Sequence, residues 1–432
     1  MAGKCTRLLA LTLWGLGVSR AVLGAEVTRV VSGPQSSRIP DVNVSLTWLH
    51  EQTSGAVKRE TESAVGLSVA KDLLYRQTRD VLQLRGDVGV WHGLSLFVVG
   101  SVVINDERGL DFDRTATCQP SSPDTDPCVS ANSSTVLRDG FFAQSTSASY
   151  GLDADNRRAF SAPSERVFRS PSRHGLEHLG LGASWAVFRQ ALDDTKPTWL
   201  VRAETRLSLG QDMRFDPGNP TANRGVGLGY HQFILSSLFS RRFGRVEPYM
   251  SGWFMLPVLT GDSTYKQPHL QHDGFDGAQK RVGAQVGTEA VLWEGRPGRR
   301  VLFEVRASGE MRLAGLAQSE IWEMLSGDQG CASNATLCRA GIDTDVNGDG
   351  NPEPNSGITR SPAYGVFGAE AGLSAYCGRH ARLRGLFGVS MQPSRTLTDG
   401  LSGNTLYDTP GRRFRMEELR TWHITVDAAA FF

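Results

Sequence analysis

The chain ends in RTWHITVDAAAFF, residues 420–432, in which polar and apolar side chains alternate from Thr421 to Ala428. Successive side chains of a β-strand point to opposite faces of the sheet, so one face of this segment is apolar. That face consists of Trp422, Ile424, Val426, Ala428, Ala430 and Phe432. Ten residues separate Trp422 from Phe432, and at roughly 3.3 Å per residue and a tilt of about 40° they span about 25 Å, which matches the apolar band of a membrane β-barrel. An amphipathic strand of a soluble β-sandwich has the same period.

The same alternation recurs along the whole chain. It is seen in DVNVSLTW (41–48), LQLRGDVGV (82–90), WLVRAETRLSL (199–209), FEVRASGEMRL (303–313) and HARLRGLFGVSM (380–391). Many of the apolar faces begin or end in an aromatic residue, short and long connections alternate, and the chain ends on its strand. Beyond the N-terminus there is no run of about 18 apolar residues, which excludes membrane-spanning helices. The sequence therefore predicts an all-β transmembrane antiparallel up-and-down β-barrel.

The segments predict about twelve strands, near 41–51, 74–91, 93–105, 175–189, 198–210, 225–243, 245–259, 279–293, 299–314, 363–377, 379–393 and 416–432. Short turns are expected at 91–94, 190–197, 241–247, 294–299 and 377–381. Long segments are expected at 52–73, 106–173, 211–224, 260–278, 315–362 and 394–414. Barrels of this kind have short periplasmic turns and long extracellular loops. The segment 62–72 is a candidate for another strand, which makes fourteen the alternative count.

The N-terminus predicts export. Lys4 and Arg7 precede the apolar run LLALTLWGLGV, and small or medium residues lead to a cleavage site ahead of Ala25. This is the pattern of a secretory signal peptide. We expect a signal peptide at 1–24, a short periplasmic segment at 25–40 and a barrel at 41–432 in the bacterial outer membrane. Its partners would be membrane lipid and, through the terminal strand ending in Phe432, the barrel-assembly machinery. A formal net charge of +1 gives no argument for nucleic acid.

Four cysteines lie in loops rich in Ser, Pro, Asp and Asn. Cys118 and Cys128 belong to CQPSSPDTDPC, and Cys331 and Cys338 belong to CASNATLC. Two close pairs in an exported chain predict two local disulfides. Zinc is the alternative, but neither segment contains a histidine or a C-x-x-C motif.

The second long loop contains the pattern D-x-N-x-D-G-x-x-E. Its oxygen-bearing residues are Asp345, Asn347, Asp349 and Glu353, with Asp343 just upstream. Carboxylates at every second residue of a tight turn converge on one point and suit a hard cation such as calcium. Position twelve, counted from Asp345, is serine and not the glutamate of an EF-hand. The hypothesis is a weak extracellular calcium site, and the alternative is an ordinary solvated acidic turn.

Charged residues of both signs occupy the polar faces of the strands, which would line the lumen. The predicted lumen residues are Arg85, Asp87, Arg202, Glu204, Arg206, Glu304, Arg306, Glu310, Arg312, Arg382, Arg384 and Asp427. Unpaired buried charges cost several kcal/mol each, so these groups either face water or pair across strands. The first arrangement is a polar channel, and the second is a barrel filled by salt bridges.

Catalysis has little support in the sequence. The best cluster is His269, His272 and Asp273 in PHLQHDGFDG, a predicted extracellular loop. No serine motif accompanies it, and G-x-S-x-G is absent. We therefore expect no catalytic residues, and no cofactor apart from calcium.

The chain resembles bacterial outer-membrane β-barrels. Within that group, DVGVWHGLSLFVV and GLGASWAVFRQALDDTKPTWLVRAETRLSLG are similar to transporter-like proteobacterial barrels associated with phenol degradation, over most of residues 40–260. The resemblance implies uptake of small, hydrophobic molecules. Fatty-acid and aromatic-compound channels have a substantial N-terminal hatch, whereas here only about 16 residues lie between the cleavage site and the first strand. Any plug is therefore expected from an extracellular loop, with 106–173 the candidate.

These observations predict a channel or transporter for passive movement of small solutes. The alternative is a sealed structural or adhesive barrel that displays loops stabilised by disulfides and calcium. An open lumen would distinguish the first hypothesis from the second.

Overall fold

The structure is a computed structural model that describes residues 25–29, 41–63, 66–111, 168–215, 223–266, 277–295, 298–326, 356–378, 380–398 and 410–432. The predicted signal peptide and most of the two longest predicted loops lie outside the described residues. Within the described ranges, no helix is both long enough and apolar enough to span a membrane.

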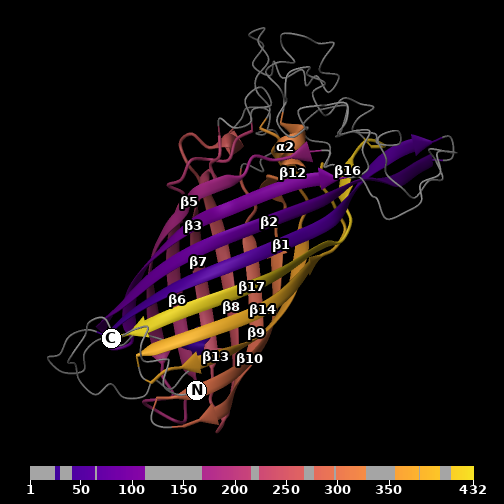
Figure 1. Ribbon diagram of the computed structural model, residues 1–432. Helices are drawn as coiled ribbons and strands as arrows, with labels where there is room; N and C mark the ends of the chain where they lie inside the picture. The colour runs from indigo at the N-terminus through magenta and orange to yellow at the C-terminus, as the bar shows by residue number, and fades with distance from the viewer. Residues whose placement is uncertain are drawn as a thin grey trace.

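Twelve long antiparallel strands form the wall of the protein (Figure 1). They are β1 (Val42–Ser63), β2 (Gly66–Trp91), β3 (Leu94–Asp111), β5 (Arg173–Phe188), β6 (Thr198–Leu207), β7 (Tyr230–Ser240), β8 (Val246–Leu259), β9 (Arg281–Glu294), β10 (Arg300–Arg312), β13 (Tyr364–Tyr376), β14 (Ala381–Gln392) and β17 (Leu419–Phe431). The predicted number of twelve strands is confirmed.

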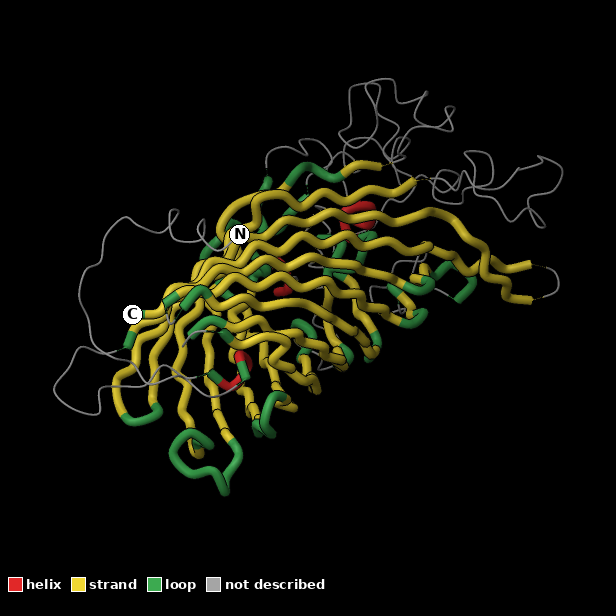
Figure 2. The backbone as a smooth tube through the Cα atoms, turned by 60° about the horizontal axis from the view of Figure 1, so that its bottom comes forward, coloured by secondary structure: helices red, strands yellow, loops and turns green. Residues whose placement is uncertain are grey.

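The wall closes where the first long strand meets the last. Each long strand pairs with the next one along the chain, and β1 also pairs with β17 from Asn43↔Phe431 to Ser54↔Arg420. In Figure 1 the yellow β17 lies directly beside the indigo β1. Figure 2 shows the strands as one continuous curved wall. Closure satisfies the backbone hydrogen-bonding groups that an edge strand would expose.

Shorter elements lie between the long strands. They are η1 (Glu26–Thr28), β4 (Phe168–Arg169), η3 (Thr264–Lys266), β11 (Gly315–Ala317), α2 (Trp322–Leu325), β12 (Thr359–Ser361), β15 (Arg395–Thr396) and β16 (Phe414–Met416). The strand β16 adds to β1 beyond the end of β17, and β11 pairs with β12. Of these short elements, η1 and α2 matter most for the interior of the barrel.

The predicted loop at 52–73 is wrong, and so is the fourteen-strand alternative. The strands β1 and β2 continue as a hairpin, with residues paired from Val42↔Val88 to Ser63↔Gly66 and one bulge after Val57. The segment 62–72 therefore belongs to this hairpin and adds no strand. Beyond the membrane both faces of a strand can meet water, so the apolar period fades while the backbone hydrogen bonds continue.

The connections at one end of the barrel are short, as predicted. The turn between β2 and β3 contains only His92 and Gly93, and Gly93 has a φ of +77°. Such a φ is unfavourable for side-chain-bearing residues, which explains a glycine in a two-residue hairpin. Short turns mark the periplasmic end. The first strand, β1, therefore begins at the periplasmic end, and the last strand, β17, ends there.

The outer surface of the wall is apolar. On β14, Leu383, Phe387, Val389 and Met391 are exposed by 55%, 55%, 49% and 47%, whereas the inward Arg382 is exposed by only 6%. The outward face of β17 carries Ile424 and Val426, as its alternation predicted. A closed antiparallel barrel with an apolar outer belt is the architecture of proteins that span the bacterial outer membrane. The chain is therefore an outer-membrane β-barrel.

Candidate functional site

The inner wall of the barrel carries ion pairs within single strands. Residues two apart on one strand point to the same side of the sheet and can contact each other. The distances are 2.7 Å for Arg85 Nη2–Asp87 Oδ1, 2.6 Å for Arg206 Nε–Glu204 Oε1 and 2.6 Å for Arg312 Nε–Glu310 Oε1. The sequence left these charges either to face water or to pair across strands, and ion pairs within one strand are an arrangement that it did not predict.

Other pairs of the inner wall connect different strands. Arg306 on β10 pairs with Glu370, which lies opposite it on β13. Further pairs join Arg384 to Glu304 and Arg382 to Asp427. Glu304, Arg382 and Asp427 are buried, with only 3%, 6% and 7% of their surface exposed. Each of these buried charges therefore has a partner of opposite charge.

Arg202 differs from the other predicted lumen residues. Its Nε donates to Ser184 Oγ at 3.2 Å, and its guanidinium carbon lies 5.8 Å from the centre of the Phe97 ring. The guanidinium of Arg85 lies 3.9 Å from the same ring. In the described part of the chain, no carboxylate oxygen lies within 4.0 Å of Arg202, so its charge has no direct counter-ion.

The periplasmic end of the barrel contains the segment 25–29. Ala25 and Thr28 are 0% and 2% exposed, and Val27 packs against the cluster Ala186, Leu200 and Leu238 on the inner face. The expectation that any plug comes only from an extracellular loop therefore needs correction, since residues 25–29 also lie inside the barrel, whereas most of the candidate loop 106–173 lies outside the described residues. The polar and apolar side chains of residues 25–29 fit the inner wall.

Contacts from several strands hold this segment. Glu26 N donates to Glu289 Oε1 at 2.9 Å, and Tyr376 Oη donates to Glu26 Oε2 at 2.7 Å. Glu26 also pairs with Arg382, and the guanidinium carbon of Arg29 lies 3.3 Å from the centre of the Phe431 ring. The segment 25–29 therefore bridges opposite sectors of the wall.

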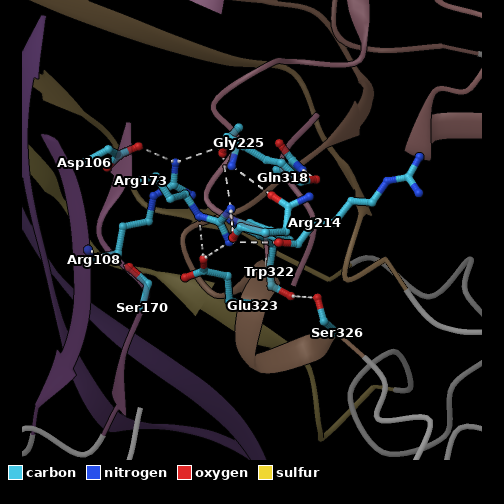
Figure 3. A network of polar contacts seen from close by, with 12 residues as sticks. Asp106, Arg108, Ser170, Arg173, Arg214, Gly225, Gln318, Trp322, Glu323 and Ser326 are labelled. Atoms are coloured by element: carbon cyan, nitrogen blue, oxygen red, sulfur yellow. Dashed lines mark hydrogen bonds and ion pairs between the residues drawn. The ribbon is translucent and has the colours of Figure 1, made fainter. Parts of the chain in front are cut away.

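At the extracellular end, α2 lies inside the mouth of the barrel. Its residues Trp322, Glu323, Met324 and Leu325 are all at most 5% exposed. Figure 3 shows the Arg173 side chain, from the start of β5, pointing at Glu323. Arg173 Nη2 and Nε lie 2.7 Å and 3.1 Å from Glu323 Oε1, and the Arg173 guanidinium carbon lies 5.2 Å from the Trp322 ring. We refer to residues 321–326 as the lid.

Arg173 also binds main-chain oxygens of the neighbouring loop. It donates to Gly225 O at 3.2 Å, to Arg214 O at 3.0 Å and to Asn223 O at 3.5 Å. The buried guanidinium therefore keeps acceptors even without the carboxylate. Burial raises the pKa of Glu323 above its ordinary value, although the adjacent Arg173 guanidinium opposes this rise.

Further ion pairs on the neighbouring strands β2, β3 and β5 involve Arg79, Asp106 and Arg108, which were not among the predicted inward-facing residues. Arg108 Nη2 lies 3.2 Å from Asp106 Oδ2, and Arg79 pairs with Glu177. Arg79 is separated from Arg85 and Asp87 by an even number of residues on β2 and so faces the same side of the strand. Applying the alternating pattern to the whole of β2 would therefore have identified Arg79 as inward-facing. Arg173 and Glu323 had no periodic signal, because Arg173 is the first residue of a strand and Glu323 lies in a helix of only four residues.

Several predicted sites lie outside the described residues. They are the calcium ligands Asp343, Asp345, Asn347, Asp349 and Glu353 and the cysteines Cys118, Cys128, Cys331 and Cys338, and both sites stay predictions. The cluster His269, His272 and Asp273, for which no catalytic role was predicted, also lies outside the described residues. The twelve predicted lumen residues do lie in described strands, but their exposure to permeating solute also stays a prediction.

The chain is similar in structure to known outer-membrane proteins. Neither a protein-family model nor a curated protein sequence matches it. An outer membrane channel from Pseudomonas putida F1 aligns over 95% of this chain and 100% of its own, with 9% identity and a TM-score of 0.42. A FadL homologue from Pseudomonas aeruginosa aligns over 91% and 90%, with 7% identity and a TM-score of 0.33. Because these TM-scores are low, the assignment to the outer membrane rests on the closed barrel and the apolar outer belt of the chain itself.

Proposed function

We propose that this barrel is a gated outer-membrane channel for passive movement of small solutes. Two short pieces of chain, the segment 25–29 and the lid, lie buried inside the barrel near its two ends, where each would obstruct the lumen. Both pieces are short and are held by hydrogen bonds, ion pairs and a few apolar contacts. Such closures can be released without opening the wall itself, whose strands are joined by continuous hydrogen-bonded ladders.

The observation that carries this proposal is that the two buried segments, 25–29 and the lid, are separate from the hydrogen-bonded strands of the wall. Ion pairs along the inner face lie within one strand or between strands of the wall, as with Arg312–Glu310 and Arg306–Glu370. Paired charges of both signs favour neither a strong anion filter nor a strong cation filter. A small polar solute that offers its own hydrogen bonds fits such a wall. A hydrophobic solute would have to use the apolar patch of Val81, Val103 and Val226, with Leu49 beside it.

The second candidate function is a sealed surface barrel that displays its extracellular loops. The buried pairs around Glu304 and Asp427 favour it, because a barrel filled by ion pairs needs no permeation path. The two functions differ in one measurable respect, which is conductance after the two closures have been removed.

The experiment is single-channel recording of the refolded mature protein in planar bilayers, with heat-modifiable gel mobility as the test of folding. Four proteins are compared: the wild type, a variant that begins at residue 30, Trp322→Ala, and the combination of the two changes. Because the closures lie in series, we expect the combination to give discrete current steps at a frequency well above either single change. Trp91→Ala is the matched control, since Trp91 is 69% exposed at the end of β2. A correctly folded combined variant that passes no current would overturn the channel proposal in favour of the sealed barrel.

A further inference from the structure

Three glutamates lie side by side on the inner wall near the periplasmic end. Glu247 on β8 is directly opposite Glu289 on β9, and Glu289 is directly opposite Glu304 on β10. They are 7%, 7% and 3% exposed. Like charges that face each other across neighbouring strands destabilise a sheet, and burial strengthens their repulsion.

Only one end of this glutamate row has its own cation. Glu304 pairs with Arg384 and also accepts a hydrogen bond from Tyr249 Oη at 2.6 Å. For Glu247 and Glu289, no lysine, arginine or histidine nitrogen of the described residues lies within 4.0 Å. Two adjacent buried carboxylates without a cation are neutralised either by a positive group from elsewhere or by a proton on one of them.

The nitrogen atoms nearest to these two carboxylates belong to the start of the segment 25–29. Ala25 N donates to Glu247 Oε1, and Glu26 N donates to Glu289 Oε1 at 2.9 Å. Ser240 Oγ donates to Glu247 Oε1 at 2.8 Å and contacts Thr28 Oγ1 at 2.7 Å, which fixes the depth of the segment. In the unprocessed chain, Ala25 N is a neutral amide with a single hydrogen to donate.

The predicted cleavage site lies at this same residue. Hydrolysis of the Gly24–Ala25 bond consumes one water and leaves a carboxylate on Gly24 and, at neutral pH, an ammonium group on Ala25. An ammonium group carries a positive charge and three donors, whereas the amide carried one donor and no charge. The reaction therefore produces a cation at the place where the glutamate row lacks one.

We propose that Glu247 and Glu289 form a binding site for the α-ammonium group of Ala25, and that signal-peptide cleavage thereby latches the segment 25–29 into the periplasmic mouth. The latch forms only in the processed chain. It follows that an uncleaved precursor holds this segment more weakly, and that the periplasmic end closes as a consequence of export. The latch does not depend on conduction through the barrel, so it can hold in a channel or in a sealed barrel.

The first test is the reactivity of the Ala25 amino group in protein extracted from membranes. Mass spectrometry of the N-terminal peptide identifies the first residue and measures its acetylation by acetic anhydride at neutral pH. A buried, ion-paired ammonium group reacts slowly, so we expect labelling roughly tenfold slower in the folded protein than in the urea-unfolded protein. A chain that begins elsewhere, or equal rates in the two states, would overturn the proposal.

The second test assigns the effect to the two glutamates. In a Glu247→Gln/Glu289→Gln variant, the Ala25 amino group should react roughly tenfold faster than in the wild type, because its counter-ions are gone. Glu294→Gln is the matched control, since Glu294 is exposed at the end of β9, and it should react like the wild type. Equal rates in the double variant and the wild type would show that these carboxylates do not hold the N-terminus.

A third measurement separates the ion pair from simple burial. Refolded protein beginning at Ala25 is prepared with a free or an acetylated N-terminus, and the melting temperatures are compared. Acetylation should lower the melting temperature of the wild type and leave the Glu247→Gln/Glu289→Gln variant unchanged. A melting temperature of the wild type that is insensitive to acetylation would contradict the latch.

Discussion

Arg173 and Glu323 are separated by 150 positions in the chain, yet Arg173 Nη2 lies 2.7 Å from Glu323 Oε1 in the mouth of the barrel. The contact joins the start of a wall strand to a single turn of helix in an extracellular insertion. It fixes the position of α2, which has only four residues and could not be stable alone. The lid is therefore held by tertiary contacts and can be weakened by single substitutions.

Trp322→Ala should release the lid. Trp322 is 1% exposed, and truncation of a buried tryptophan costs about 3–5 kcal/mol. We expect amide hydrogens of residues 321–326 to lose roughly a hundredfold or more of their exchange protection, while the wall strands keep theirs. Hydrogen exchange followed by mass spectrometry measures both. Trp91→Ala serves as control, and similar losses in the two variants would contradict a specific role for Trp322.

Lid closure should weaken as the pH rises. The pKa of Glu323 is raised by burial in the closed lid, so the closed form holds a proton that the released, hydrated form loses. The stabilisation is complete below the ordinary glutamate pKa and is lost as the pH rises through the raised pKa of the closed form. The rate of amide hydrogen exchange at residues 321–326, corrected for the intrinsic pH dependence of exchange, should therefore increase as the pH rises.

Glu323→Gln is the informative control for this pH effect. Arg173 keeps its hydrogen bonds to Gly225 O and Arg214 O, so the neutral amide should leave the lid closed. Its exchange should be independent of pH over the range in which the wild type changes. A variant that retains the wild-type pH dependence would show that another group titrates.

Alternation along the strands was sufficient to predict the wall. The outward Ile424 and Val426 and the inward Asp427 follow directly from period two, because one side of the wall meets lipid. The same rule failed at 52–73, where β1 and β2 leave the membrane and the polar side chains no longer report the backbone pairing.

The two closures could not be predicted from periodicity. Residues 25–29 and α2 are short segments whose positions depend on single long-range contacts, such as Glu26 N to Glu289 Oε1 and Arg173 to Glu323. A contact between residues far apart in the chain has no local pattern. The charge of Glu289 was visible on the inward face, but its lack of a cation became clear only when its neighbours were placed.

Arg202 should influence ion selectivity. Among the predicted lumen arginines it alone has no carboxylate oxygen of the described chain within 4.0 Å, so its field is not cancelled at short range. In the conducting variant that lacks both closures, Arg202→Gln should lower the anion-to-cation permeability ratio by roughly two- to threefold. Reversal potentials in a salt gradient measure this ratio.

The matched control for Arg202 is Arg420→Gln. Arg420 pairs with Glu418 on the exposed side of the wall, so its removal should leave the ratio unchanged. An unchanged ratio in Arg202→Gln would mean that the permeation path does not pass this arginine.

The acidic loop should respond to calcium if Asp345, Asn347 and Asp349 converge on one cation. A cation bound only to the folded loop adds stability in proportion to the logarithm of its concentration. We expect a chelator to lower the melting temperature of the wild type by a few degrees, and millimolar calcium to restore it. In Asp345→Asn/Asp349→Asn the site loses two charges, so chelator and calcium should have no effect. Magnesium tests the ligand geometry, because it demands a tighter octahedral shell and should restore less. A melting temperature of the wild type that ignores both chelator and calcium would leave the pattern as a solvated acidic turn.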